Sequence, residues 1–326
     1  MIAILRKQWF VVALIAAVVS GISFPQVASL NENGQITTII VALVFLGMGF
    51  TLPSESFAAG FAKWKIHLFI QFYIFFFIPA FFYITTTLFK DCILTELYIG
   101  LLALAVLPTT ISTCSVYTQI SNGDVALTLF NASLSNILGI LISPILLSFF
   151  LRDVGRAMPL SVFIGIIISL AFKMILPLCM GQALRFLFLK SAAKLKRIIG
   201  VLSNLMVLAI VFFTLAKSAS TTQLEESLEM MFFPALYLVI AHFLLIAISV
   251  GIAKLFRYTG PEIISVMYAA PQKTLAMGAP LLAAYFVDDP ALLGMAILPL
   301  LFYHPWELFV SGVLKSLSIV KDWGRE

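Results

Sequence analysis

Residues 268–280 read YAAPQKTLAMGAP, and this stretch combines two features that a lipid-facing helix does not tolerate. Pro271 interrupts the backbone, because a proline removes a helical hydrogen bond and clashes with the preceding turn. Lys273 places an ammonium group among apolar residues, at a cost of about 2.5–3.5 kcal/mol at membrane depth. Broken helix survives in a membrane only inside protein or beside a water-filled cavity. The stretch therefore predicts a functional site inside a membrane protein.

The composition places the whole chain in a membrane. Of its 326 residues, 62% are hydrophobic and only 11% are charged, and the mean hydropathy is +1.09. A soluble globular domain carries about 25% charged residues. The apolar runs are long and repeated, which indicates a helical bundle rather than a barrel of ~10-residue alternating strands. The sequence therefore predicts an all-α integral membrane protein.

The residue pattern does not favour an enzyme. Cys92, Cys114 and Cys179 show neither metal-site spacing nor a disulfide framework. The sequence contains no phosphate-binding loop, no metal-ligand spacing and no paired catalytic carboxylates. We therefore expect no catalytic residue and no cofactor, and any transport work must come from ion or solute gradients.

Ten segments have the length and apolar character of a membrane-spanning helix, which needs about 20 residues. Short polar links such as NENGQ (31–35) and SNGD (121–124) separate them. The ten predicted spans are 8–24, 37–53, 66–89, 97–120, 124–151, 159–186, 198–217, 231–255, 261–287 and 290–314.

The basic residues give the orientation, because lysine and arginine concentrate in cytoplasmic loops. With ten spans and both termini cytoplasmic, fourteen of them lie inside and four lie outside. An odd number of spans would scramble this bias. Residues 315–326 are then a cytoplasmic tail. The four outside residues are Lys90, Arg152, Arg156 and Lys217.

Ten spans divide into two halves of five, residues 8–151 and 159–314. A half with an odd number of spans reverses its orientation, so repeated halves are inverted. Span four (97–120) and span nine (261–287) each carry a proline and small polar residues in mid-segment. Interrupted spans at matching positions of two halves indicate the binding site of a transporter.

Spans four and five supply oxygen atoms to this site. The hydroxyl groups after Pro108 suit a small cation such as Na⁺ or a hydrogen-bonded substrate, although a plain proline kink has the same hydroxyls. Thr128, Asn131 and Ser135 share one helix face, which either binds a ligand or holds helices together. The candidate hydroxyls of span four are Thr110, Ser112, Thr113 and Ser115. The candidate Na⁺ ligands are Ser112, Thr113, Thr128 and Asn131.

Three roles are open for Lys273. It binds an anionic substrate, replaces a mobile cation with a fixed positive charge, or pairs with Glu307 of span ten. His304 lies three residues before Glu307 on the same helix face, so the two either relay protons or form a satisfied pair. Lys173 is a second lysine within a span and is expected to face protein. The remaining candidate binding residues are Gln71, Gln272 and Thr274.

Seven short motifs occur in an order that is typical of one carrier family. The chain resembles the bile acid:sodium symporter superfamily, solute carrier family ten, and within it the SBF-like branch that includes vertebrate member seven. The resemblance covers roughly residues 5–315. The motifs that carry it are RKQWF near the start, HLFIQ (67–71), PTTIST (108–113), GDVALTLFN (123–131), P-L-x-x-G-Q (177–182), QKTLAMGAP (272–280) and YHP (303–305).

The resemblance implies a fold of ten transmembrane helices in two inverted five-helix repeats. Spans one, two, six and seven would form a panel domain, and spans three to five and eight to ten would form a core domain. Spans four and nine would be discontinuous helices that cross in the core, with substrate bound beside the crossing.

The sequence departs from this family at the crossing. Bacterial relatives place a glutamate there, followed by glutamine and asparagine, and bind two Na⁺. Here Met267 stands at the nearest position and Lys273 follows. Two bound Na⁺ do not fit this pattern, and Lys273 would occupy the space of one of them. Coupling to one Na⁺, to H⁺ or to no ion stays open.

The sequence thus predicts a secondary transporter, a symporter that moves an organic solute by alternating access. The solute is unidentified, and anionic solutes are among the candidates. The alternative is a non-transporting regulator or ion-binding protein that affects cation homeostasis, since vertebrate relatives of this branch are linked to cellular calcium. The expected partners are a small organic solute and the lipid bilayer, not nucleic acid, for a monomer or homodimer. The expected location is the plasma membrane, as a multi-pass protein of a bacterial inner membrane.

Overall fold

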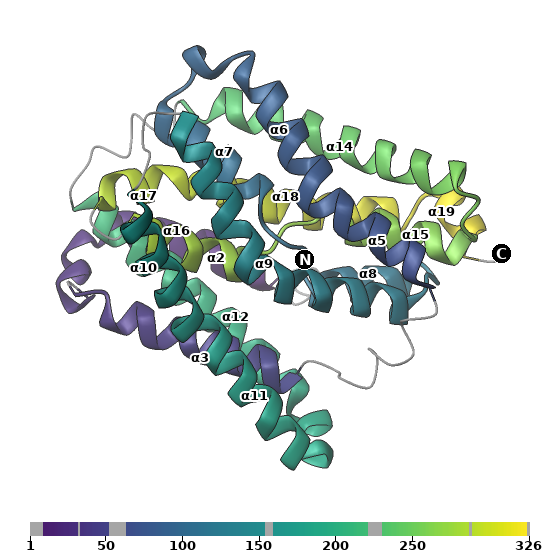
Figure 1. The fold of residues 1–326 in the computed structure, drawn as a ribbon, viewed down its shortest axis with the longest axis horizontal. Coiled ribbons are helices and arrows are strands. Elements are labelled where there is room, and N and C mark those ends of the chain that lie inside the picture. Colours follow the sequence, from purple (N-terminus) through teal and green to yellow (C-terminus); the bar gives the residue numbers. More distant parts are fainter. Residues whose placement is uncertain are drawn as a thin grey trace. The chain divides into compact units, whose positions relative to one another are not determined.

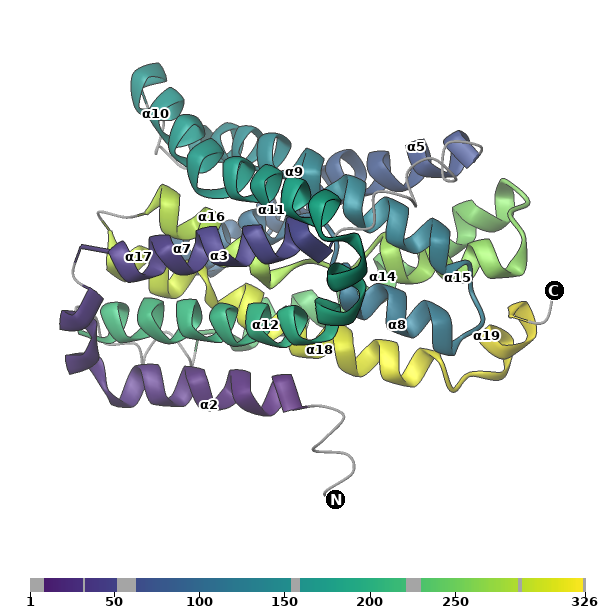
Figure 2. The same cartoon turned by 90° about the horizontal axis from the view of Figure 1, so that it is seen from below.

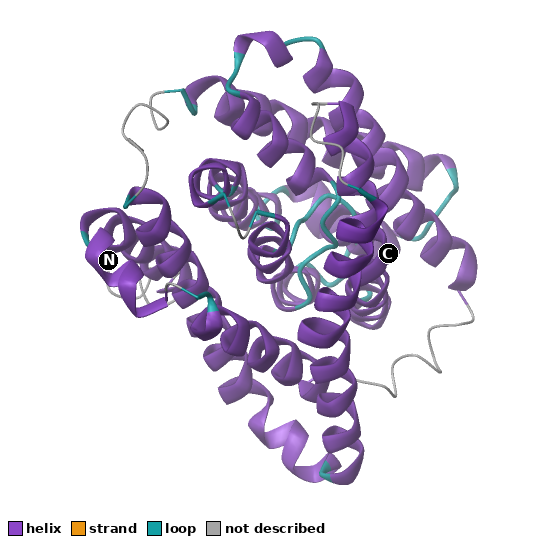
Figure 3. Ribbon diagram, turned by 60° about the vertical axis from the view of Figure 1, so that its left-hand side comes forward, coloured by secondary structure: helices purple, strands orange, loops and turns teal. Residues whose placement is uncertain are grey.

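The computed structural model describes residues 9–31, 33–51, 63–153, 159–220, 230–286 and 289–324. Within these ranges every regular element is a helix, as Figure 3 shows. The chain divides into two compact units, each built from separate parts of the sequence. Both units contain residues of both predicted repeats, whose inverted relation remains a prediction.

The first unit comprises Met1–Leu52, Met158–Met230 and Ala276–Leu298. Its helices are α2 (Trp9–Ser23), η1 (Pro25–Asn31), α3 (Gln35–Thr51), α10 (Leu160–Leu170), η5 (Ala171–Ile175), α11 (Leu176–Leu187), α12 (Leu189–Ala219), most of α16 (Leu275–Tyr285) and α17 (Pro290–Ala296). Helix α3 packs against α11 and α12, as Figure 1 shows. Helix α2 lies along the other side of α12 (Figure 2).

The grouping of residues 276–298 differs from the panel and core domains that the family resemblance implies. These residues belong to the predicted spans nine and ten, which the resemblance assigns to the core domain. Instead they group with the first unit, because α17 packs against α12.

Two glycines allow α3 and α11 to approach closely. A Cβ at Gly49 would overlap the backbone of Leu178, and one at Gly181 would overlap the backbone of Leu46. Lipid gives no hydrophobic drive for helix association, so membrane helices use small residues to bring backbones together. These two glycines therefore set the spacing of α3 and α11.

The second unit comprises Pro53–Ala157, Met231–Leu275 and Pro299–Glu326. Its helices are α5 (Trp64–Phe72), η3 (Tyr73–Phe77), α6 (Ile78–Thr87), η4 (Lys90–Cys92), α7 (Thr95–Ala105), α8 (Ser112–Ile120), α9 (Val125–Asp153), α14 (Phe232–Leu255), α15 (Gly260–Ala269), most of α18 (Leu298–Leu314) and α19 (Ser318–Trp323). Helix α9 contacts α5, α7, α8 and α15. Helices α6 and α14 are joined by the hydroxyls of Thr85 and Tyr237, 2.6 Å apart.

Six stretches of the described chain are long and apolar enough to cross a membrane, and α2 with η1 makes a seventh if their 93° bend lies within one span. These findings support a multi-pass membrane protein. Helices lie at all ten predicted spans, but α3 has only 17 residues and spans four and nine are broken. The count of ten therefore remains a prediction. The six stretches are Trp64–Thr87, Val125–Arg152, Leu160–Leu187, Ile198–Ala219, Phe232–Leu255 and Pro290–Leu314.

The tail predicted at 315–326 contains the short helix α19. Its Val320 is buried in an apolar cluster with Ile264 and Met267 of α15 and Val310 of α18. Met267 is the position at which the family resemblance implies a sodium-binding glutamate. The apolar surroundings explain why a methionine suits this position, because a carboxylate there would be desolvated without a partner.

Candidate functional site

The two predicted helix breaks lie against each other inside the second unit. Helix α7 ends at Ala105 and α8 begins at Ser112, while α15 ends at Ala269 and α16 begins at Leu275. The backbone N–H of Thr274 donates to the carbonyl oxygen of Pro108 at 2.9 Å. Prolines thus open both helices, as the sequence predicted, and each opened segment supplies groups to the other.

Five consecutive carbonyl groups of the first break, those of residues 105–109, each accept a hydrogen bond. Thr274 N–H donates to the carbonyl oxygen of Pro108. Ser143 Oγ donates to Val106 at 2.6 Å, and Asn136 Nδ2 donates to Thr109 at 2.7 Å. Lys273 Nζ donates to the remaining two, Ala105 at 2.8 Å and Leu107 at 2.7 Å. The break is therefore satisfied by protein groups, as broken backbone at membrane depth requires.

The ammonium group of Lys273 lies at the carboxyl end of α7. A helix carries partial negative charge at this end, and a cation within the last turn is stabilised by it. Lys273 is only 2% exposed, so the carbonyl groups replace its hydration shell. Among its three predicted roles, this geometry supports that of a fixed cation.

Glu307 contacts Lys273, as one interpretation of the sequence held, but through the lysine backbone and not through an ion pair of the two side chains. Its Oε2 accepts a hydrogen bond from the backbone N–H of Lys273 at 2.8 Å, and its Oε1 lies 2.8 Å from Nδ1 of His304. The predicted contact between His304 and Glu307, three residues apart on one face of α18, is therefore present. The carboxylate is fully buried. It comes from α18 and stabilises the second break by accepting the hydrogen bond of a backbone N–H group there.

Gln272 joins the two breaks through its side chain. Its Oε1 accepts hydrogen bonds from Thr110 Oγ1 at 2.7 Å and Thr113 Oγ1 at 3.2 Å, and it lies 2.9 Å from Cys114 Sγ. Its Nε2 donates to Ser311 Oγ at 2.9 Å. The sequence singled out Gln272 and both threonines, whereas Cys114 and Ser311 were missed.

A second polar cluster lies between α5 and α9. Gln71 Nε2 donates to the Asn131 backbone oxygen at 3.1 Å and to its Oδ1 at 3.2 Å. Asn131 Nδ2 lies 2.9 Å from His67 Nδ1. Within the described chain the buried Oε1 of Gln71 has no hydrogen-bond partner. A buried amide oxygen without a donor can accept from a bound molecule or coordinate a cation.

The remaining candidates lie apart from both clusters. Thr128 Oγ1 lies 3.1 Å from Thr118 Oγ1, Ser135 donates to its own helix at the Ala132 oxygen, and Ser115 donates to the Ser112 oxygen. The Ser112 side chain is exposed. The four candidate Na⁺ ligands thus belong to different hydrogen-bonded groups. The sequence pattern could not reveal this, because helical spacing fixes a face but not the neighbour of that face.

An ion-pair cluster lies at the first turns of α9 and α15. Lys63 Nζ lies 2.9 Å from Asp124 Oδ2 and 2.7 Å from Glu262 Oε1. Partial burial opposes ionisation of Asp124, but hydrogen bonds from Leu127 N–H and Lys63 outweigh it and lower the pKa of the carboxyl. Glu262 also accepts a hydrogen bond from Thr259 N–H at 3.0 Å, as part of the capping box at the start of α15.

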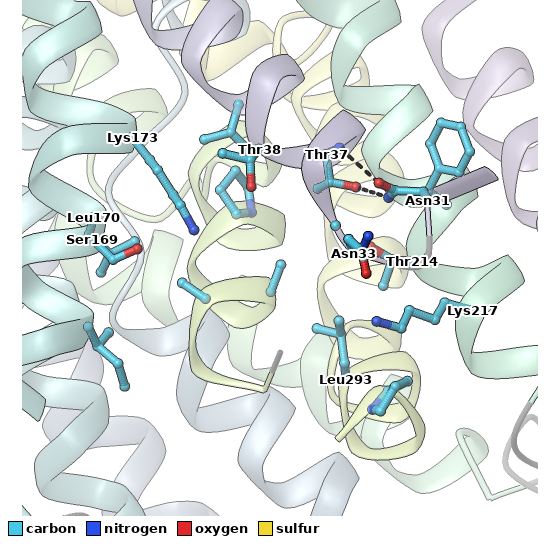
Figure 4. A pocket seen from close by; sticks show the side chains of 18 of the residues that line it. Asn31, Asn33, Thr37, Thr38, Ser169, Leu170, Lys173, Thr214, Lys217 and Leu293 are labelled. Carbon is cyan, nitrogen blue, oxygen red and sulfur yellow. Dashed lines mark hydrogen bonds between the residues drawn. The ribbon is translucent and has the colours of Figure 1, made fainter. Parts of the chain in front are cut away.

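The first unit contains a separate pocket of about 380 Å³. Figure 4 shows that Lys173 extends into it from one wall and Lys217 from another. Neutral polar side chains also line the pocket, Asn33, Thr38 and Ser169 among them.

Comparison with known proteins identifies the family of the chain. A profile of the SBF-like CPA transporter family matches residues 8–318. The "Sodium/bile acid cotransporter 7-B" of Xenopus laevis is 26% identical over 98% of this chain and 93% of its own length. The "Sodium/bile acid cotransporter 7" of Danio rerio is 26% identical over 100% of this chain and 98% of its own.

A bacterial relative extends the match. An uncharacterized protein of Pseudomonas aeruginosa is 25% identical over 94% of this chain and 91% of its own length. The family profile spans both helix breaks and all the candidate residues of the second unit. The chain therefore belongs to the SBF-like CPA transporter family.

Proposed function

We propose that the protein moves an organic solute across the membrane by alternating access, driven by a cation gradient, with Lys273 as a built-in cation at the helix break. The observation that carries this proposal is the position of Lys273 Nζ on the Ala105 and Leu107 carbonyl oxygens. In secondary transporters with broken helices, such carbonyls at the end of a half-helix bind the coupling cation. Here an ammonium group occupies that place.

Two sites in the second unit could bind the coupling cation, one suited to Na⁺ and one suited to H⁺. Na⁺ would use oxygen atoms outside the Lys273 contact, such as Gln71 Oε1, which has no hydrogen-bond partner among the described residues, beside Asn131. H⁺ would use the buried carboxylate of Glu307 with His304. A carboxylate that gains or loses a proton changes the charge beside the second break, which can bias one conformation of the protein.

The coupling ion is tested in proteoliposomes that contain the purified full chain. Uptake of ²²Na⁺ and acidification reported by the dye pyranine are measured while a library of organic solutes is supplied outside. We expect one solute class to cause either ²²Na⁺ entry or acidification. A complete lack of solute and cation flux under Na⁺, H⁺ and voltage gradients would contradict the proposal.

The proposed setting is the inner membrane of a bacterium, with both termini in the cytoplasm, in a monomer or homodimer. Lys90→Cys and Lys194→Cys, each made after the three native cysteines are replaced by serine, test the orientation by their reaction with a membrane-impermeant maleimide in intact spheroplasts. We expect only the Lys90→Cys protein to react, because Lys90 belongs to the outside set and Lys194 to the inside set.

A further inference from the structure

The pocket of the first unit has the size and lining of a small-molecule site. Its volume of about 380 Å³ falls within the range of about 300–1,000 Å³ that is typical of ligand pockets. Helices α3, α10, α12 and α17 contribute to its walls, together with η5 and residues 280–284. Nothing in the family match assigns a ligand to it.

Lys173 is the decisive residue of this pocket. It lies in the middle of the stretch Leu160–Leu187, thirteen residues from one end, which is about 20 Å along a helix. Its side chain cannot reach the membrane surface along such a distance. A charged lysine at this depth costs about 2.5–3.5 kcal/mol unless a partner compensates it.

No such partner occurs in the described part of the protein. Lys173 has no hydrogen bond and no ion pair with any described residue. Figure 4 shows its side chain extending into the pocket, toward Thr38. Its backbone lies in the π-helical turn η5, and such single turns are frequent at functional sites. An anion in the pocket would therefore give Lys173 the partner that the described residues do not supply.

The other polar groups of the pocket suit an anion. Lys217 supplies a second ammonium group from α12, and Asn33, Thr38 and Ser169 supply neutral donors. None of the described lining residues is an aspartate or glutamate. Asp289, which is next to Pro290 of the lining, accepts a hydrogen bond from Leu292 N–H at 3.1 Å as the cap of α17.

Two further features define the ligand. Asn31 is not available to it, because its amide bonds to Thr37 Oγ1 at 2.6 Å and to Ile36 N–H at 3.0 Å and so holds the turn before α3. Apart from Thr37 and Thr214, the rest of the wall is apolar. Its larger apolar side chains are Val41, Val162, Ile166, Leu170, Phe213 and Leu293.

We propose that this pocket binds an organic anion, whose charged group pairs with Lys173 and whose compact apolar body lies against the apolar wall. Inorganic phosphate or sulfate would satisfy the ammonium group of Lys173 but leave the apolar wall in water. The inference deepens the proposed function by naming the class of solute. Only the statement that the bound anion is also the transported solute rests on the proposed function.

The test measures binding without any gradient. The purified full chain is placed in nanodiscs of zwitterionic lipid, and its affinity for 2-naphthoate is compared with that for the neutral analogue 2-naphthamide by isothermal titration calorimetry. We expect 2-naphthoate to bind at least about tenfold more tightly, because only the anion pairs with the ammonium group of Lys173. Equal affinity for the two compounds would overturn the proposal.

Three variants locate the binding. Lys173→Gln should weaken 2-naphthoate binding about tenfold or more, and Lys173→Arg should restore most of it. Lys90→Gln removes one positive charge from an exposed position of the other unit and should leave the affinity unchanged. Thermal unfolding of each variant shows whether it is folded. A folded Lys173→Gln protein with wild-type affinity would overturn the proposal.

Two competitors separate the sources of the anion. Inorganic phosphate that displaces 2-naphthoate at equal concentration would show a site for inorganic anions and overturn the proposal. Phosphatidylglycerol that abolishes binding, and is retained by the wild type but not by Lys173→Gln in native mass spectrometry, would show a lipid site and also overturn it. Intact 2-naphthoate binding without any flux in proteoliposomes would instead contradict the proposed transport function alone.

Discussion

The ammonium group of Lys273 lies 2.8 Å from the carbonyl oxygen of Ala105, a residue 168 positions earlier in the chain. A side chain from the second half of the chain thus completes the end of a helix in the first half. The same lysine offers its backbone N–H to Glu307. Lys273 therefore links both helix breaks to α18. If its ammonium group is removed, two buried carbonyl groups lose their hydrogen-bond donor.

Replacing Lys273 with alanine should reveal whether the ammonium stands in place of a metal cation. Lys273→Ala leaves the Ala105 and Leu107 carbonyls without a donor, so we expect a loss of about 2–4 kcal/mol in the free energy of unfolding and no transport. If the ammonium replaces Na⁺, then 100 mM NaCl should raise the melting temperature of the variant more than 100 mM choline chloride does.

The matched control for this experiment is Lys90→Ala, which removes an exposed lysine. Its melting temperature should equal that of the wild type in both salts. A melting temperature of Lys273→Ala that matches the wild type, or that responds equally to the two salts, would contradict the assigned role of Lys273.

Neutralising Glu307 should separate proton coupling from structure. In Glu307→Gln the amide oxygen can still accept from the Lys273 backbone N–H, so we expect the free energy of unfolding to fall by no more than about 1 kcal/mol. The variant cannot exchange a proton at this position. Solute-dependent acidification in proteoliposomes should be lost, whereas ²²Na⁺ entry, if present in the wild type, should persist.

Glu96→Gln serves as the control, because Glu96 lies in the first turn of α7, away from the breaks. It should retain acidification. Unchanged solute-dependent acidification in Glu307→Gln would exclude this carboxylate as the site of proton coupling.

Sequence reasoning found the elements of the site because their chemistry is anomalous within an apolar chain. A proline in each of two matched spans, and a lysine beside one of them, predicted two breaks that the structure shows at 106–111 and 270–274. The contact between His304 and Glu307 was predictable because helix geometry places residues three apart on one face.

The partners of these residues were not predictable in the same way. The acceptors of Lys273 are backbone carbonyls, which carry no sequence signal. Cys114 and Ser143 are ordinary small residues of membrane helices, and only the fold shows that the first contacts Gln272 and the second serves the Val106 carbonyl. The pocket around Lys173 was hidden for a similar reason, since its walls come from segments more than 100 residues apart.

Adding a methyl group at Gly181 should separate α11 from α3. The new Cβ would overlap the Leu46 backbone, which cannot move without shifting α3. We expect Gly181→Ala to lower the free energy of unfolding by about 1–3 kcal/mol. Gly200→Ala is the matched control, because a Cβ at Gly200 in α12 meets nothing within 4 Å and alanine favours a helix. It should be neutral or stabilising, so equal effects of the two changes would contradict the close contact of α3 and α11.

Neutralising Asp124 should reduce stability only above the acid range. The Asp124 pKa is lowered in the folded protein, so its ionised form stabilises the fold above the unfolded-state pKa of about 3.9, and this contribution is lost as the pH falls through the folded-state pKa. The asparagine introduced by Asp124→Asn would still cap α9 through its side-chain oxygen, so the substitution removes chiefly the charge that faces Lys63. We expect a loss below about 1 kcal/mol at pH 7 and low salt, because the pair is partly exposed and salt screens it.

In thermal melts between pH 3 and pH 8, the difference in stability between Asp124→Asn and the wild type should shrink toward zero at the acid end. Asp91→Asn, at an exposed position, should show no difference from the wild type at either end. A deficit of Asp124→Asn that stays constant down to pH 3 would mean that the capping geometry, rather than the charge, accounts for the stability.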